Sequence, residues 1–164
     1  MAVRRSMWDA LDGFDPQLPA GWEDTEICWR AWLRGWKSAY VSDAVCWHHV
    51  GGSSTSPKGA RFRLRGACIG RLLFSTKHLP LEDVLLAWSV EAAGAIGDVL
   101  SGDFGRGRER ILLIGSCVRA LPEWIAERRR LYGETASSSR AMVRLMRSIA
   151  SHGRMDKSHA GADV

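Results

Sequence analysis

The strongest constraint on the fold is a regular spacing of apolar residues in the second part of the chain. Between residues 81 and 99 these side chains recur every three or four positions, at Leu81, Val84/Leu85, Trp88, Ala92, Ala95/Ile96 and Val99. Such spacing places them along one face of an α-helix. Further helices are predicted over residues 61–78, 108–121, 122–131 and 137–150. The chain after residue 57 is therefore predicted to be mostly helical.

The first part of the chain has a different pattern. Helices are predicted near residues 4–11 and 22–35, with a loop rich in proline and glycine between them. Residues 40–47 favour a strand because they include valines and aromatic residues. The stretch "GGSSTSPKG" that follows is typical of a flexible connection. It divides a mixed α/β segment, residues 1–56, from a helical extension, residues 57–150.

The final residues, 151–164, have almost nothing to bury and are predicted to be disordered. The four cysteines are scattered without a Cys-x-x-Cys pair, and the first residues lack the apolar stretch of a signal peptide. Reduced thiols in a cytoplasmic protein are therefore expected. No uncharged run approaches the roughly 18 residues that would suggest a membrane span.

Charge is shared unevenly along the chain. The net charge is +5, but residues 1–56 hold five Lys and Arg against seven Asp and Glu. The remaining residues hold eighteen against eleven. Such asymmetry suggests that the second part faces an anionic partner, whereas a solvated surface of a packed helical appendage is equally compatible with it.

Two adjacent carboxylates, Glu23 and Asp24, stand directly before a helix that is rich in tryptophan. Acidic residues in the first turn of a helix are stabilised by exposed backbone N–H groups, by about 0.3–1 kcal/mol each. The same carboxylates could take part in acid–base chemistry, because the Gly/Pro loop before the helix could hold them at a cleft. The residues alone leave both interpretations open.

Two histidines and two serines follow the predicted strand. Adjacent strand residues point to opposite faces, so only one of His48 and His49 can look into a given site. An imidazole there could bind a metal or simply be packed. A zinc site built from these histidines and the two nearest cysteines matches no zinc-finger spacing. Ser53 and Ser54 could donate hydrogen bonds to a phosphate, although Gly/Ser loops are commonly only connections.

Taken in order, these elements resemble the carboxy-terminal part of the catalytic domain of family 2 glycosyltransferases, in the rhamnosyltransferase-like group. That family shows a basic residue, "GGFD", "ED", a "DLCxR" helix, a "GW" turn, a "YVPDA" strand and an aromatic residue before His. The corresponding positions are Arg4–Arg5, Leu11–Asp15, Glu23–Asp24, Glu26–Arg30, Gly35–Trp36, Tyr40–Ala44 and Trp47–His48. Two positions depart from it, Asp12 in place of Gly and Ser42 in place of Pro.

The resemblance covers about the first third of the chain and implies a fold. Residues 1–56 would be the carboxy-terminal portion of a glycosyltransferase catalytic domain of the GT-A type, an α/β fragment. A mostly α-helical extension would follow it.

The resemblance also implies roles for individual residues. Asp24 would be the general base that deprotonates an acceptor hydroxyl, whose oxygen then attacks the anomeric carbon of a nucleotide sugar with inversion. Glu23 would orient the site. His48 would approach the diphosphate or a divalent metal, Mg²⁺ or Mn²⁺. The implied substrate-binding residues are Trp22, Trp47, Ser53 and Ser54.

The same family binds its nucleotide through an upstream βαβ region that ends in an Asp-x-Asp motif. This chain contains no Asp-x-Asp. It is therefore interpreted as a partial glycosyltransferase of cell-surface polysaccharide or glycolipid synthesis, inactive without the missing amino-terminal half. Whether the chain by itself is an enzyme stays open.

The alternative function is a non-enzymatic basic helical module that binds an anionic membrane surface or nucleic acid. Arg140, Arg144 and Arg147 stand opposite an apolar stripe, which suits peripheral contact with the inner face of a membrane. Nucleic-acid binding has less support, because the sequence shows no helix-turn-helix cue and no interleaved aromatic residues.

Overall fold

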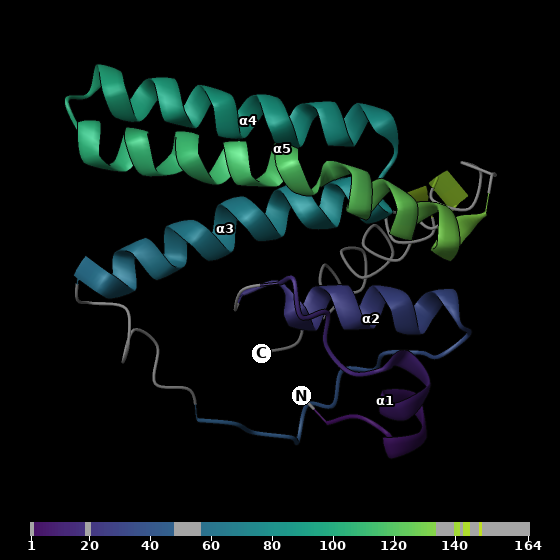
Figure 1. Ribbon diagram of the computed structural model, residues 1–164. Coiled ribbons are helices and arrows are strands. Elements are labelled where there is room, and N and C mark those ends of the chain that lie inside the picture. The colour runs from purple at the N-terminus through teal and green to yellow at the C-terminus, as the bar shows by residue number, and fades with distance from the viewer. Residues whose placement is uncertain are drawn as a thin grey trace, which may run out of the picture.

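A computed structural model describes residues 2–18, 21–47 and 57–133, together with residues 140, 141, 143, 144 and 148. Five α-helices lie in the described ranges (Figure 1). They are α1 (Arg5–Leu11), α2 (Glu23–Leu33), α3 (Pro57–His78), α4 (Leu81–Leu100) and α5 (Phe104–Tyr132). None of the described helices is long and apolar enough to cross a membrane.

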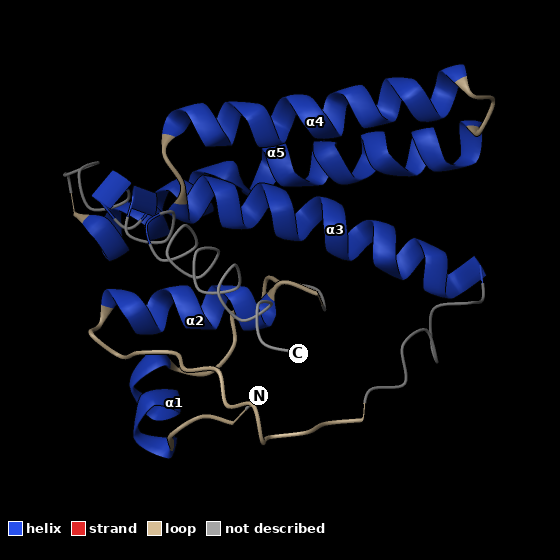
Figure 2. Ribbon diagram, turned by 180° about the vertical axis from the view of Figure 1, so that it is seen from behind, coloured by secondary structure: helices blue, strands red, loops and turns tan. Residues whose placement is uncertain are grey.

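Helices α3, α4 and α5 form a bundle in which consecutive helices run in opposite directions. α4 and α5 lie side by side along their lengths, and α3 crosses beneath them (Figures 1 and 2). Two residues separate α3 from α4. α4 begins directly after Pro80, whose ring fixes φ at a value compatible with a helix start. At the other end, the Asp103 carboxylate accepts a hydrogen bond from the Arg106 N–H at 3.0 Å and caps α5. The buried centre of the bundle contains Cys68, Leu72, Leu73, Leu113, Cys117 and Trp124.

The amino-terminal helices are held against the carboxy-terminal half of α3 by tryptophans. The Trp22 ring lies over Gly70, where an added Cβ would meet Trp22 Cδ1 at 2.1 Å, so a side chain at this position would displace the ring. Phe74, one turn further on, contacts both Trp22 and Trp29, with ring centroids 5.5 and 5.4 Å apart. Aromatic pairs at these separations add to the stabilisation from burial itself. The first part of the chain is therefore packed on the extension.

The turn after α1 depends on left-handed backbone at two successive residues. Asp12 has a φ of 58° and Gly13 a φ of 68°. Aspartate tolerates this conformation better than most side chains because its short carboxylate can bond locally. Asp12 stands where the glycosyltransferase pattern has glycine, so the departure falls at a position whose backbone favours glycine.

The predicted α/β fold is wrong for the described residues, which contain helices and no strand. The segment predicted as a strand, residues 40–47, is irregular chain without a ladder partner in the described part. It contains a turn at which the Ala44 N–H donates to the Val41 carbonyl at 3.2 Å. Its Tyr40 and Trp47 side chains are 92% and 94% exposed. A strand persists only where a neighbour takes up its backbone hydrogen bonds, and the described residues supply none. Propensity alone could not form the sheet.

The helix predictions agree better with the structure than the strand prediction does. Those for residues 4–11, 22–35, 61–78 and 81–99 are confirmed to within a few residues. The two helices predicted on either side of residue 122 are in fact one, α5, with Pro122 inside it. Proline costs a helix one hydrogen bond, but the buried Cys117 and Trp124 hold α5 in the bundle on both sides of it. The predicted boundary after residue 56 and the tail from residue 151 lie outside the described residues.

Candidate functional site

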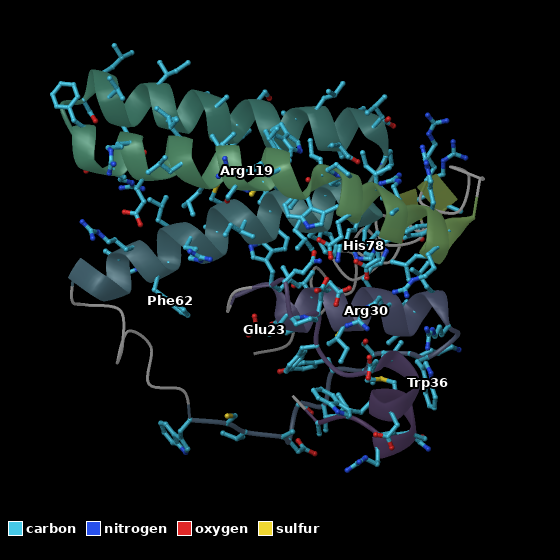
Figure 3. The ribbon with its side chains drawn as sticks, in the orientation of Figure 1. Glu23, Arg30, Trp36, Phe62, His78 and Arg119 are labelled. Atoms are coloured by element: carbon cyan, nitrogen blue, oxygen red, sulfur yellow. The ribbon has the colours of Figure 1, made fainter. Side chains whose placement is uncertain are left out.

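The two carboxylates open α2. Asp24 is exposed, and its Oδ1 accepts a hydrogen bond from the Thr25 N–H at 2.7 Å. Glu23 is half-buried, and its Oε2 accepts from the backbone N–H groups of Trp22, at 2.9 Å, and Gly21. These are contacts of first-turn acids with a helix start. Glu23 is thereby fixed (Figure 3), while the Asp24 carboxylate stays accessible to solvent.

The other predicted site residues are placed less completely. Trp22 is half-buried against α3, so part of its ring is covered by the fold. Trp47 is almost fully exposed at the end of the described segment. His48, Ser53 and Ser54 lie outside the described residues. The predicted approach of Asp24 and His48 to one pocket therefore stays a prediction.

The described residues do not form a metal site, since they contain no group of three or more His, Cys, Asp or Glu side chains that could hold an ion. All four cysteines are free. Burial raises the pKa of the Cys68 thiol to about 12 and that of Cys117 to about 11, which keeps both protonated. Because the thiolate is the form that reacts as a nucleophile, these two buried cysteines are packing residues of the bundle.

A buried polar cluster at the junction of α2, α3 and α5 was not predicted from the sequence. Glu26 is 1% exposed, and its Oε1 accepts hydrogen bonds from Arg30 Nε at 2.6 Å and from His78 Nε2 at 3.3 Å. Arg30 also donates to the carbonyls of Leu11, at 2.5 Å, and Gly13, at 2.8 Å. Glu26 and Arg30 thus join α2 both to the turn after α1 and to α3 (Figure 3).

The cluster continues from His78 into α5. Trp29 Nε1–H donates to the Tyr132 hydroxyl at 2.6 Å, and that hydroxyl lies 2.9 Å from His78 Nδ1. Because an indole N–H can only donate, the tyrosine oxygen accepts from it and can donate its own proton to Nδ1. His78 then carries its proton on Nε2 and donates to Glu26. The chain of hydrogen bonds thus assigns one tautomer of a neutral imidazole.

Burial sets the protonation of this cluster. It lowers the pKa of His78 below 6.5, more than the nearby Glu26 raises it. Burial alone would raise the pKa of Glu26, but hydrogen bonds from His78 and Arg30 outweigh it and the net shift is downward from 4.5. Burial also raises the pKa of Tyr132, to about 12. At neutral pH the cluster therefore holds a carboxylate, a guanidinium, a neutral imidazole and a phenol.

A second buried ion pair lies beside the first. Lys77 is 0% exposed, and its Nζ contacts Asp15 Oδ2 at 2.6 Å and Glu127 Oε2 at 2.5 Å. Asp15 is the last residue of the "GFD" sequence, so this element is bound directly to α3 and, through Lys77, to α5. The pattern that resembles the glycosyltransferases therefore depends on the extension for its shape.

Stability is expected to fall as the pH drops below about 6.5. The unfolded chain protonates histidine near 6.5, whereas folded His78 resists the proton, so below that pH the unfolded state binds more protons and is favoured. The lowered pKa of Glu26 adds a further loss of stability as the pH falls below 4.5. Urea unfolding followed by tryptophan fluorescence at pH 8, 6.5, 5.5, 4.5 and 3.5 measures this trend.

The matched variant is His78→Gln, which removes the titrating group. Its free energy of unfolding should be lower at pH 8 but should change less than that of the wild type between pH 8 and 5.5. If the free energy of unfolding changed equally with pH in the two proteins, His78 would not be the source of the pH dependence.

Comparison with known proteins gives a family match over the first part of the chain. Residues 1–68 match the family model described as "Glycosyltransferase like family 2". No curated protein and no solved structure matches the chain. The matched range covers α1, α2 and the first half of α3, and so includes Glu23, Asp24 and the buried Glu26–Arg30 pair. The match supports a glycosyltransferase-type function, with a nucleotide-sugar donor and an acceptor as the general substrates.

Proposed function

We propose that this chain supplies the acceptor side of an inverting glycosyltransferase of the GT-A type, in the rhamnosyltransferase-like group. The observation that supports the proposal is the family match over residues 1–68, which includes an exposed carboxylate at the start of α2. Cell-surface polysaccharide or glycolipid synthesis is the proposed process.

In the proposed reaction the Asp24 carboxylate removes the proton of an acceptor hydroxyl. The hydroxyl oxygen forms a bond to the anomeric carbon of the donor sugar, and the bond from that carbon to the nucleoside diphosphate breaks on the opposite side, which inverts the centre. Glu23 positions Asp24, because its contacts with two backbone N–H groups fix the first turn of α2. One hydrogen bond, donated by the Thr25 N–H, orients the Asp24 carboxylate.

Substrate contacts are proposed for residues around this helix start. Trp22 and Trp47 would pack on sugar rings, since aromatic faces suit the apolar faces of sugars. Ser53, Ser54 and His48 would approach the diphosphate. A requirement for Mg²⁺ or Mn²⁺ is a prediction for the complete enzyme alone.

Sugar transfer is proposed to need a nucleotide-binding region in addition to the residues of this chain. The sequence has no Asp-x-Asp, and the described residues contain no sheet on which a nucleotide could be held.

The test is to restore such a region and measure transfer. The DNA immediately upstream of Met1 and the neighbouring genes are searched for a βαβ region with Asp-x-Asp, which is then produced with this chain. Release of nucleoside diphosphate from UDP- and dTDP-sugars is measured with octyl glycosides as acceptors. Activity that needs both parts supports the proposal, whereas a restored protein that binds nucleotide but transfers no sugar contradicts it.

Peripheral contact with an anionic membrane, on its cytoplasmic face, is a second proposal. It is favoured by α3, which has no acidic residue and whose Arg61, Arg63 and Arg65 are exposed, and by the exposed Arg140 and Arg144. Basic residues near an anionic surface each contribute on the order of 1 kcal/mol. The vesicle measurement described in the next subsection tests this contact.

A further inference from the structure

A cavity of about 770 Å³ lies where α3 diverges from the α4–α5 pair. Figure 2 shows this divergence towards the amino-terminal end of α3. None of the predicted glycosyltransferase site residues that the structure describes lines the cavity. Its lining is rich in charged side chains and combines three carboxylates, Glu91, Asp103 and Glu109, with five arginines. The arginines are Arg61, Arg63, Arg71, Arg106 and Arg110.

The inner wall of this arginine cavity is fixed by one buried carboxylate. Glu91 is 1% exposed and contacts Arg71 Nη1 at 3.0 Å and Arg110 Nη1 at 2.6 Å. Arg110 also binds Asp98, from Nε at 2.9 Å, and lies against Gly94, where an added Cβ would be 3.0 Å from its Cζ. Two guanidinium groups are therefore held in place at the inner end, Arg71 by Glu91 and Arg110 by Glu91 and Asp98 together.

At the mouth of the cavity the arginines are held loosely. The Arg61 side chain is 77% exposed and pairs with Glu109 at 3.5 Å, and that of Arg106 is 55% exposed and pairs with Asp98 at 3.4 Å. Long ion pairs between exposed side chains contribute little to stability and can exchange for a better acceptor. Each guanidinium carries five N–H donors in a fixed fork that matches the oxygens of a phosphate. The mouth therefore offers donors that an incoming anion can take.

We propose that the arginine cavity binds a phosphoanion of diphosphate size, with Arg71 at the inner end and Arg61 and Arg106 closing over it. Three observations combine in this proposal. The lining arginines exceed by one the carboxylates that line the cavity or pair with its arginines, because Asp98 binds both Arg106 and Arg110. In addition, α3 contributes no acidic residue, and the volume lies within the usual range of small-molecule sites. The arginines would bind the phosphate oxygens, which a free phosphate compound and a lipid headgroup both carry. The proposal does not depend on the glycosyltransferase assignment.

The test uses two variants with the same change in charge. Arg61→Gln/Arg106→Gln removes the mouth arginines and leaves the buried Glu91 contacts of Arg71 and Arg110 intact. The control, Arg119→Gln/Arg129→Gln, removes two exposed arginines of α5 that do not line the cavity. Binding of inorganic pyrophosphate is measured by calorimetry in low-salt buffer. Flotation with vesicles of phosphatidylcholine, with and without phosphatidic acid, measures binding to a lipid headgroup. Circular dichroism checks that both variants are folded.

The mouth variant is expected to lose binding tenfold or more, since charge-assisted hydrogen bonds to phosphate are among the stronger ones. The control should lose less than threefold. Selective loss with pyrophosphate identifies a soluble ligand, and selective loss only with phosphatidic acid vesicles identifies a lipid headgroup. The proposal is overturned by equal losses in both variants, which would indicate general charge attraction, or by the absence of binding to either probe.

Discussion

Asp24→Asn is expected to lower sugar transfer by the restored enzyme by roughly 10²- to 10⁴-fold, the usual contribution of a positioned general base. Asparagine has nearly the same shape and can still accept the Thr25 N–H hydrogen bond, but it cannot take a proton from the acceptor. The measurement is the rate of nucleoside diphosphate release at saturating donor. Donor affinity should change little, because the loss falls on the chemical step.

The control for this variant separates catalysis from helix capping. Glu82, like Asp24, is an exposed acidic residue at the second position of its helix. Glu82→Gln and Asp24→Asn should each reduce helix stability by about 0.3–1 kcal/mol, because each removes a charge near a helix start. Only Asp24→Asn should reduce turnover. Retained turnover in Asp24→Asn would rule out its assignment as the base, whatever the fate of the rest of the proposal.

Arg30→Met is expected to destabilise the fold by about 3–5 kcal/mol, because it leaves the Glu26 carboxylate buried without its cationic partner. The side chains of this pair are 12% and 1% exposed. The same substitution frees the carbonyls of Leu11 and Gly13, so the turn before α2 should loosen as well. Urea unfolding at pH 8 measures the change.

Arg5→Met provides a matched control. Arg5 and Asp9 form another pair four residues apart in a helix, but their side chains are 87% and 55% exposed, so water replaces the lost partner. That variant should unfold almost as the wild type does. In addition, Glu26→Gln combined with Arg30→Met should recover part of the lost stability, because the buried charge itself is then gone. Similar midpoints for Arg5→Met and Arg30→Met would contradict the role of the buried pair.

The sequence predicts the described helices well because each depends on a local pattern. The apolar spacing over residues 81–99 and the glycine after α2 predict helices that the structure contains. Pro122 misled the prediction because the cost of proline is local, whereas the buried contacts of Cys117 and Trp124 that continue α5 are not. Residues 40–47 misled it because strand propensity describes a residue in a sheet, and the described residues contain no strand with which this segment could pair.

The candidate site divides in the same way. The place of Glu23 and Asp24 at a helix start could be predicted from the sequence and is confirmed, whereas their catalytic role stays a prediction. His78 and Tyr132 could not be predicted, because they reach Glu26 and Trp29 across 52 and 103 positions of sequence. A partial signal was present in Glu26 and Arg30, an acidic and a basic residue four positions apart on one helix face, and in Glu91, a lone charge within an apolar stripe.

The family match stops at residue 68, halfway along α3, yet the contacts that shape the matched part lie beyond it. Trp22 packs on Gly70, Trp29 contacts Phe74, and Asp15 pairs with Lys77. A polypeptide cut at residue 68 would expose those side chains to water. Joining residues 1–68 to another tail would therefore preserve their packing only if the whole of α3 and α5 were kept, so the structural unit is larger than the stretch that the family model matches.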